Sequence, residues 1–289
     1  MYQSFEEIGE IEKTTGKAFW EIVRDADCRE LEITAEEAFR RMEERYEAMR
    51  SADASYSATR TSSSGLTGGD GEKIAAARQA GTLLCGSFIG LVMEKAVKMG
   101  ESNACMRRIV AAPTAGSCGV LPAVLLSLEA ERKYPVTEMV KARYTAAGIG
   151  GIIAQRASVS GAAGGCQAEI GAASAMAAGG VAYLLGGGSE VIAHAAALAM
   201  KNLLGLACDP VAGLVEVPCV KRNVIGAVNA LTSADLAVSG IRSRIPPDEV
   251  FDAMRSIGRI MPEELKETGR GGLAATPTGL SYKEALKGF

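Results

Sequence analysis

A twenty-residue stretch from Ile170 to Ser189 constrains the fold more than any other part of this sequence. The stretch carries no charged side chain, and six of its residues are Gly and six are Ala. Its length would allow a helix to cross a bilayer, but Ile and Leu together number only three, so its transfer into lipid gains little free energy. We therefore predict a buried helix of a soluble protein. A membrane-spanning helix is the alternative.

The composition points to a core built from small side chains. Of the 289 residues, 48% are hydrophobic and only 5% are aromatic. A chain of this length and hydrophobicity can bury a large core and is not expected to be disordered. Because large side chains are few, helices must approach one another closely through Gly and Ala. The net charge of −3 gives no sign of the basic surface that binds nucleic acid, so no nucleic-acid partner is expected.

Apolar residues recur at helical spacing along the chain, and few runs alternate strictly as strands do. Ser4 and Thr34 each precede a Glu by three positions, which is the spacing of a capping box. Further helices are predicted over 73–98, 136–158, 169–185, 190–204, 223–239 and 247–260, and an apolar helix follows a Pro/Gly-rich turn within 109–130. The sequence thus predicts an all-α fold with Gly-rich active-site loops. We expect one domain over residues 1–289, with residues 1–60 as an N-terminal helical segment inside it.

Three of the seven cysteines lie in unusual surroundings. Cys166 lies in GAAGGCQAEIG, Cys208 in LGLACDPVAG and Cys219 in VEVPCVKRN, so each is expected at a helix end or in a loop. Backbone N–H groups there can donate to sulfur, and a helix N-terminus favours the thiolate. The alternative is that these small apolar side chains fill a Gly/Ala core. No C-x-x-C pair is present, so spacing alone is a weak metal signal.

The start of the chain gives the expected compartment. Residues 1–10 carry three Glu and no apolar run, so no secretory signal is predicted and the protein is expected in the cytoplasm. A disulfide framework is not expected there.

The segments around the three cysteines resemble the α chain or α domain of the iron–sulfur-dependent L-serine dehydratases. The cysteines are 42 and 11 positions apart, in agreement with that family. The resemblance runs from about residue 60 to residue 280. Its other similar segments are SSSGLTGGD (62–70), IVAAPTAGSCGVLPAVL (109–125), GLACDPVAGLVEVPC (205–219) and GGLAATPTG (271–279).

The resemblance implies a [4Fe–4S] cluster held by Cys166, Cys208 and Cys219, with one iron open to substrate. That iron would bind the hydroxyl of L-serine as a Lewis acid, and a base would remove the α-proton. The aminoacrylate so formed would yield pyruvate and ammonia. The expected activity is L-serine ammonia-lyase, and no pyridoxal phosphate is implied.

Two loops are expected on the substrate side of this site. The SSSGLTGGD loop offers hydroxyls and amides that can hold a carboxylate, although an ordinary turn or cap is the alternative. The Pro–Gly turn around residue 114 has the same character. The substrate-side groups predicted from these loops are Ser62, Ser63, Ser64, Gly65, Thr114 and Ser117.

The general base stays open among three sources. Lys73 follows the serine-rich loop and can face the site or the solvent. His194, the one histidine, lies in a helical segment in which a core histidine is the favoured interpretation. The third source is another chain. Cys28, Cys85 and Cys105 are interpreted as core or surface thiols, and Cys118, in APTAGSCG, either fills the core or lines the site.

The resemblance also implies a partner. Fused members of the family carry an extra domain with a His-Pro-Ser-Ser-Ser-His-Thr-type motif, which is absent here. Because residues 1–60 are too short and too helical to be that domain, we expect a separate β chain that completes the active site, in a heterodimer or higher assembly. Some fused members end in a cysteine that occupies the open iron. This chain ends in Leu-Lys-Gly-Phe, so such regulation is not expected.

Three other functions remain to be distinguished. A related iron–sulfur hydro-lyase would act on another hydroxy amino acid, such as threonine, or on a hydroxy acid. A non-enzymatic protein would hold zinc with three Cys and water. A Gly/Ala-rich membrane or scaffolding protein would need detergent for solubility.

Overall fold

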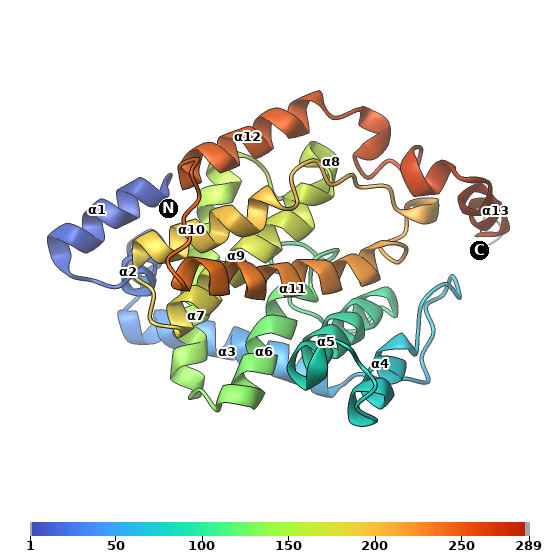
Figure 1. Ribbon diagram of the computed structural model, residues 1–289, viewed down its shortest axis with the longest axis horizontal. Helices are drawn as coiled ribbons and strands as arrows, with labels where there is room; N and C mark the ends of the chain where they lie inside the picture. Colours follow the sequence, from blue (N-terminus) through green and yellow to red (C-terminus); the bar gives the residue numbers. More distant parts are fainter. Residues whose placement is uncertain (1, 287–289) are drawn as a thin grey trace.

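The computed structural model describes residues 2–286, which form thirteen α-helices and no strand (Figure 1). The all-α prediction is confirmed. The helices are α1 (Phe5–Thr15), α2 (Phe19–Leu31), α3 (Ala35–Ala54), α4 (Asp70–Gln79), α5 (Gly86–Ala104), α6 (Val120–Arg132), α7 (Val136–Arg156), α8 (Gly161–Gly164), α9 (Ala172–Leu184), α10 (Ser189–Lys201), α11 (Cys219–Val238), α12 (Pro247–Ile260) and α13 (Pro277–Ala285). A π-helical turn, Gln167–Gly171, leads into α9.

Helix α9 is the centre of the molecule. Its residues from Ala172 to Ala182 are all buried, and α6, α7, α10 and α11 pack around it. In Figure 1 it lies behind α11, which crosses the front of the molecule. This is the uncharged stretch that the sequence marks as a buried helix. Within residues 2–286, no helix combines the length and the apolar character that crossing a bilayer requires.

Glycines let the central helices approach closely, as the composition predicts. A Cβ added at Gly148 of α7 would lie 2.4 Å from Cγ2 of Val23 in α2. A Cβ at Gly179 of α9 would lie 2.0 Å from Cδ1 of Ile149 in α7. No side chain fits at either position without movement of its neighbour, because interiors are close-packed.

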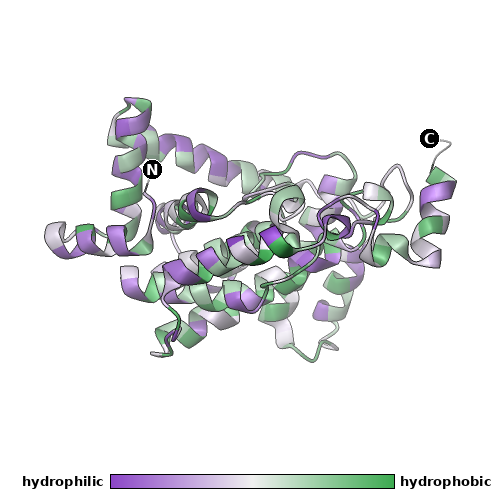
Figure 2. Ribbon diagram, turned by 90° about the horizontal axis from the view of Figure 1, so that it is seen from above, coloured by the Kyte–Doolittle hydropathy of each residue, from purple (hydrophilic) through white to green (hydrophobic). Residues whose placement is uncertain are grey.

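The N-terminal helices begin where the capping signals predict. The Ser4 hydroxyl accepts a hydrogen bond from the Glu7 N–H (3.0 Å), and the Thr34 hydroxyl accepts one from Glu37 (3.2 Å). Figure 2 shows hydrophilic and hydrophobic residues mixed along these helices, as expected of helices with one buried face. One cluster of buried hydrophobic side chains extends from Phe5 to Met254, so α1 to α3 share the core of the later helices.

The single helix predicted over residues 73–98 is wrong. Helix α4 ends at Gln79 and α5 begins at Gly86. Gly81 and Gly86 have φ angles of 69° and 74°, respectively, in the left-handed region, which interrupts a right-handed helix. Good helix formers lie on both sides of the break, so helix propensity does not mark the interruption.

Candidate active site

Cys166 lies in a tight turn between α8 and the π-helical turn before α9. Gly165, which precedes it, has a φ of 75°, and a Cβ there would lie 2.9 Å from the carbonyl oxygen of Leu206. The Gln167 N–H donates to that same carbonyl (3.0 Å). The turn therefore holds Cys166 against the segment that carries Cys208, and only glycine fits at position 165.

Cys208 and Cys219 also lie outside helix interiors, as predicted for all three cysteines. The Cys208 N–H donates to Leu265 O and the Glu267 N–H donates to Cys208 O, both at 2.8 Å, which forms an isolated parallel bridge with the segment after α12. Cys219 is the first residue of α11 and follows the cis peptide Val217–Pro218.

The three thiols gather in one buried place. Cys166, Cys208 and Cys219 are 3%, 2% and 7% exposed. A hydrogen bond between the Cys166 and Cys208 thiols lowers the pKa of Cys166 and raises that of Cys208. Burial raises the pKa of Cys219 to about 12, and the charges of Cys166 and Glu169 add to this rise. Segments far apart in sequence thus bring together the cysteines that the sequence singled out.

Arg222, one turn into α11, places a positive charge beside these thiols. Its guanidinium donates to Ala207 O (2.8 Å) and pairs with Asp209 (2.9 Å). Its charge and a hydrogen bond also favour the thiolate of Cys166. The site can therefore carry a negative charge on sulfur, because a cation is held next to it.

Glu169 is a buried acid that sequence reasoning missed. One carboxyl oxygen accepts the hydroxyl proton of Thr114 (2.7 Å), and the other lies 3.6 Å from the Cys208 sulfur. Burial raises its pKa. A signal was present, since Glu169 is the last charged residue before the uncharged stretch and lies within GGCQAEIG.

The Pro–Gly turn before α6 reaches the thiols through this acid. Thr114 and Ser117 form a hydroxyl pair (3.1 Å), and Ser117 is fully buried. A Cβ at Gly116 would lie 3.0 Å from a Glu169 carboxyl oxygen, so the turn and the acid are in close contact. The two predicted hydroxyls therefore lie beside the cysteines.

The serine-rich loop reaches the same region through Glu216, a second acid that sequence reasoning missed. The hydroxyls of Ser62 and Ser64 donate to Oε2 of Glu216 at 2.6 and 2.7 Å. Glu216 is 6% exposed and precedes Cys219 by three residues. By contrast, Ser63 and Gly65 are exposed. The loop thus directs two of its four predicted groups toward the cysteine-bearing segment.

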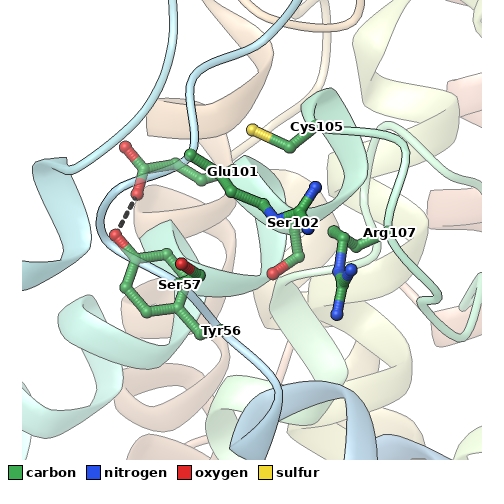
Figure 3. Close-up of a pocket in the computed structure, with 7 residues that line it drawn as sticks. Tyr56, Ser57, Glu101, Ser102, Cys105 and Arg107 are labelled. Carbon is green, nitrogen blue, oxygen red and sulfur yellow. Dashed lines mark hydrogen bonds between the residues drawn. The ribbon is translucent and has the colours of Figure 1, made fainter.

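Glu101 supports the loop from the other side. Its carboxylate accepts the Tyr56 hydroxyl proton (2.6 Å; Figure 3) and the N–H groups of Asp70 (2.8 Å) and Gly71 (3.1 Å). These amides begin α4, where a negative charge is favourable. The acid therefore anchors the end of the serine-rich loop. Cys105 lines a small pocket together with Tyr56 and Glu101 (Figure 3).

Neither candidate base of this chain contacts the thiols. The Lys73 side chain is 76% exposed and pairs with Asp70 (2.7 Å), which also pairs with Lys221. His194 lies on α10 and lines a cleft with α1 and α12. Its side chain is largely buried, and its Nδ1 has no hydrogen-bond partner among residues 2–286. The role of Lys73 as a base stays a prediction.

The remaining cysteines are separate from this site or buried in the core. Cys85 is exposed, and Cys28 and Cys105 are partly buried. Cys118 is fully buried, packs with Met99 and contacts its carbonyl oxygen (3.8 Å). Cys118 therefore lies in the core, which is the first of its two interpretations.

These features define a class of helical protein in which buried thiols from three segments meet beside hydroxyl-bearing loops. Residues 14–274 match the family described as "Serine dehydratase alpha chain". The chain is 46% identical to the "Probable L-serine dehydratase, alpha chain" of Bacillus subtilis, over all of this chain and 96% of that protein. It is 52% identical to the protein of the same name from Latilactobacillus sakei, over 68% of this chain and 94% of that one.

A longer relative is "L-serine dehydratase TdcG" of Escherichia coli. The two are 46% identical over 62% of this chain, which covers 40% of that protein. The chain therefore belongs to the family of serine dehydratase alpha chains.

Proposed function

We propose that this chain is the cluster-bearing chain of a two-chain L-serine dehydratase, which removes water from L-serine and releases pyruvate and ammonia. The observation that carries the proposal is the meeting of three cysteine thiols beside the Pro–Gly turn at one buried place, with the serine-rich loop bound to the segment that precedes Cys219. Two relatives that this chain covers over nearly their whole length are named "Probable L-serine dehydratase, alpha chain".

The donor set suits a [4Fe–4S] cluster bound by Cys166, Cys208 and Cys219. Clusters of this kind are held by thiolates, and a cationic neighbour such as Arg222 offsets their charge. Among residues 2–286, no three His, Cys, Asp or Glu side chains are arranged to bind a single metal ion. Each thiolate of a cluster can bind a different iron, so the thiols need not converge on one atom. When bound, the cluster supplies a Lewis acid for the departing hydroxyl, and pyridoxal phosphate has no role in the proposal.

The chain's own side chains have two tasks in this proposal. Arg222 compensates the charge of the thiolates and fixes the Cys208 segment through Asp209 and Ala207. The hydroxyls of Thr114, Ser62 and Ser64 are oriented by buried acids and so present fixed polar groups to a small substrate. Binding energy is then not spent on ordering these groups.

The partner in the proposal is a separate β chain in a heterodimer or higher assembly. Two observations support it: the relatives of matching length are named alpha chains, and this chain covers only 40% of a relative named without that qualifier. The β chain would complete the site and can supply the base.

The proposal is tested by anaerobic cluster reconstitution of the chain with its β chain. Four iron and four sulfide per chain, visible absorption and pyruvate formation from L-serine are expected together. Cys208→Ala should abolish all of them, whereas Cys28→Ala should leave them intact. One zinc per chain, or threonine turned over in preference to serine, would contradict the proposal.

A further inference from the structure

Glu216 is a buried carboxylate whose hydrogen-bond partners are neutral. Only the hydroxyls of Ser62 and Ser64 donate to it within residues 2–286, and no lysine or arginine of that range pairs with it. The buried acid Glu94, by contrast, pairs with Arg78 and Lys98, at 2.8 and 2.6 Å. A buried negative charge costs free energy unless a cation pairs with it. The surroundings of Glu216 therefore suit a positively charged group.

The direction of the hydrogen bonds strengthens this conclusion. A carboxylate can only accept, so Ser62 and Ser64 each use their one hydroxyl proton toward Glu216. Both hydroxyls can then act only as acceptors. Ser62 accepts the Thr67 N–H (3.3 Å), and Ser64 accepts the Leu66 N–H (3.1 Å). A group with several N–H donors fits such an environment, whereas a carboxylate would be repelled. These two hydroxyls therefore have no proton left to donate to a carboxylate, and the carboxylate-binding role expected for the loop stays a prediction.

The cluster of Glu216, Ser62 and Ser64 reaches the surface through Ser64 and lies on the segment that leads to Cys219. Ser64 is partly exposed, and the neighbouring Ser63 is exposed. Glu216 precedes Cys219 by three residues, and its carbonyl accepts the Val220 N–H (3.0 Å) at the start of α11. In serine, the ammonium and the hydroxyl are on adjacent carbons. Groups that bind them must lie near one another, and Glu216 is three residues from Cys219, one of the thiols proposed to hold the cluster.

We infer that Glu216, Ser62 and Ser64 form the subsite for the α-ammonium group of the substrate. The subsite makes this protein selective for hydroxy amino acids over hydroxy acids. The inference rests on the proposed function for the nature of the reaction. Glu169, another buried acid without a cationic partner within residues 2–286, borders the Cys208 sulfur at 3.6 Å and accepts the hydroxyl proton of Thr114 in the Pro–Gly turn.

The test compares two unreactive ligands that differ only at the α-substituent, L-alanine and L-lactate. The reconstituted two-chain holoenzyme is prepared with wild-type chain and with Glu216→Gln, which keeps the shape and removes the charge. We expect the dissociation constant of L-alanine and the KM for L-serine to rise about 10- to 100-fold. The dissociation constant of L-lactate should change by less than about threefold, since one hydrogen bond to a neutral group is at stake. Ligand-induced shifts in melting temperature give a readout independent of turnover.

Two further variants separate binding from folding. Glu101→Gln changes another buried acid that accepts a hydroxyl proton. It should lower the melting temperature without changing the ratio of the L-alanine and L-lactate dissociation constants. Ser64→Ala keeps the Glu216 charge and removes one acceptor, so it should weaken L-alanine several-fold and leave L-lactate unchanged. This variant decides the matter if Glu216→Gln fails to fold.

Equal weakening of both ligands by Glu216→Gln would overturn the inference, as would loss of selectivity in Glu169→Gln with none in Glu216→Gln. Failure of the proposed function looks different, because the wild-type holoenzyme would then produce no pyruvate from serine. The ratio of the dissociation constants of L-alanine and L-lactate would still report on the subsite.

Discussion

Asn223 is the side chain that joins the Pro–Gly turn to α11. It is 1% exposed, its Oδ1 accepts the Gly119 N–H (2.8 Å), and its Nδ2 donates to the carbonyls of Gly116 and Cys219 (both 2.9 Å). Removing it leaves buried backbone groups without partners. We expect Asn223→Ala to lower the free energy of unfolding by about 2–4 kcal/mol, measured by urea denaturation.

A matched control is available on the surface. Asn202 is exposed and donates one hydrogen bond, to Asn229 (2.6 Å). Asn202→Ala should change the free energy of unfolding by no more than about 0.5 kcal/mol. Similar effects of the two substitutions would show that Asn223 does not hold the turn.

Among the single residues of the site, the sequence predicted the cysteines better than the buried glutamates. Cys166, Cys208 and Cys219 stand out because their motifs and intervals match a family, and the structure brings them together. Glu169 and Glu216 lie in the same motifs, but their residue type gives a weaker signal, since most glutamates of a soluble chain are solvated. What distinguishes them is burial against hydroxyls from loops 55 and 154 residues away in sequence, and no local pattern encodes that.

Among the helices, glycine has opposite effects at two positions. Gly148 lies inside α7, where a Cβ would meet the branched side chain of Val23 at 2.4 Å. Gly9 lies inside α1, where a Cβ would have no atom of another described residue within 4 Å. We expect Gly148→Ala to destabilise the protein by about 1–3 kcal/mol. Gly9→Ala should stabilise it by about 0.5–1 kcal/mol, because alanine is the better helix former.

Thermal and urea unfolding of both variants check this pair. If Gly148→Ala raised the stability as Gly9→Ala is expected to do, helix propensity would outweigh packing at that position. The contact between α2 and α7 would then have room for a methyl group.

The helices themselves were largely predictable, whereas some of their ends were not. Helix α12 (Pro247–Ile260) has the predicted bounds, because a proline fixes its start. Helix α11 begins at Cys219, four residues before the predicted start, since no Ser, Thr, Asp or Asn marks that end. The break between α4 and α5 depends on two left-handed glycines, and glycine occurs too often in this chain to reveal which ones end helices.

For the whole molecule, His194 links stability to pH. Burial lowers its pKa below the ordinary value of 6.5, Arg242 and Lys201 lower it further, and Glu190 opposes them. The unfolded chain therefore takes up this proton at a higher pH than the folded chain does. Stability should fall as the pH drops below about 6.5, and His194→Gln should remove this part of the fall.

Urea unfolding of both proteins at pH 7.5 and pH 5.5 measures the effect. Paired carboxylates such as Asp70, whose pKa Lys221 and Lys73 lower below 3.8, lose their contribution only in stronger acid, so the two windows are separate. An equal decline in wild type and His194→Gln would assign the change to other groups.

The octet from Glu216 to Asn223 has a consequence for how this chain can vary. Its side chains point to three different segments: Glu216 to the serine-rich loop, Arg222 to the Cys208 segment, and Asn223 to the Pro–Gly turn. Each residue added to a helix turns everything beyond it by about 100°. One inserted amino acid would rotate Arg222 and Asn223 away from their partners while leaving Glu216 in place. The rotational phase of this short stretch thus sets the geometry of the site. We expect insertions and deletions among related chains to fall outside residues 216–223.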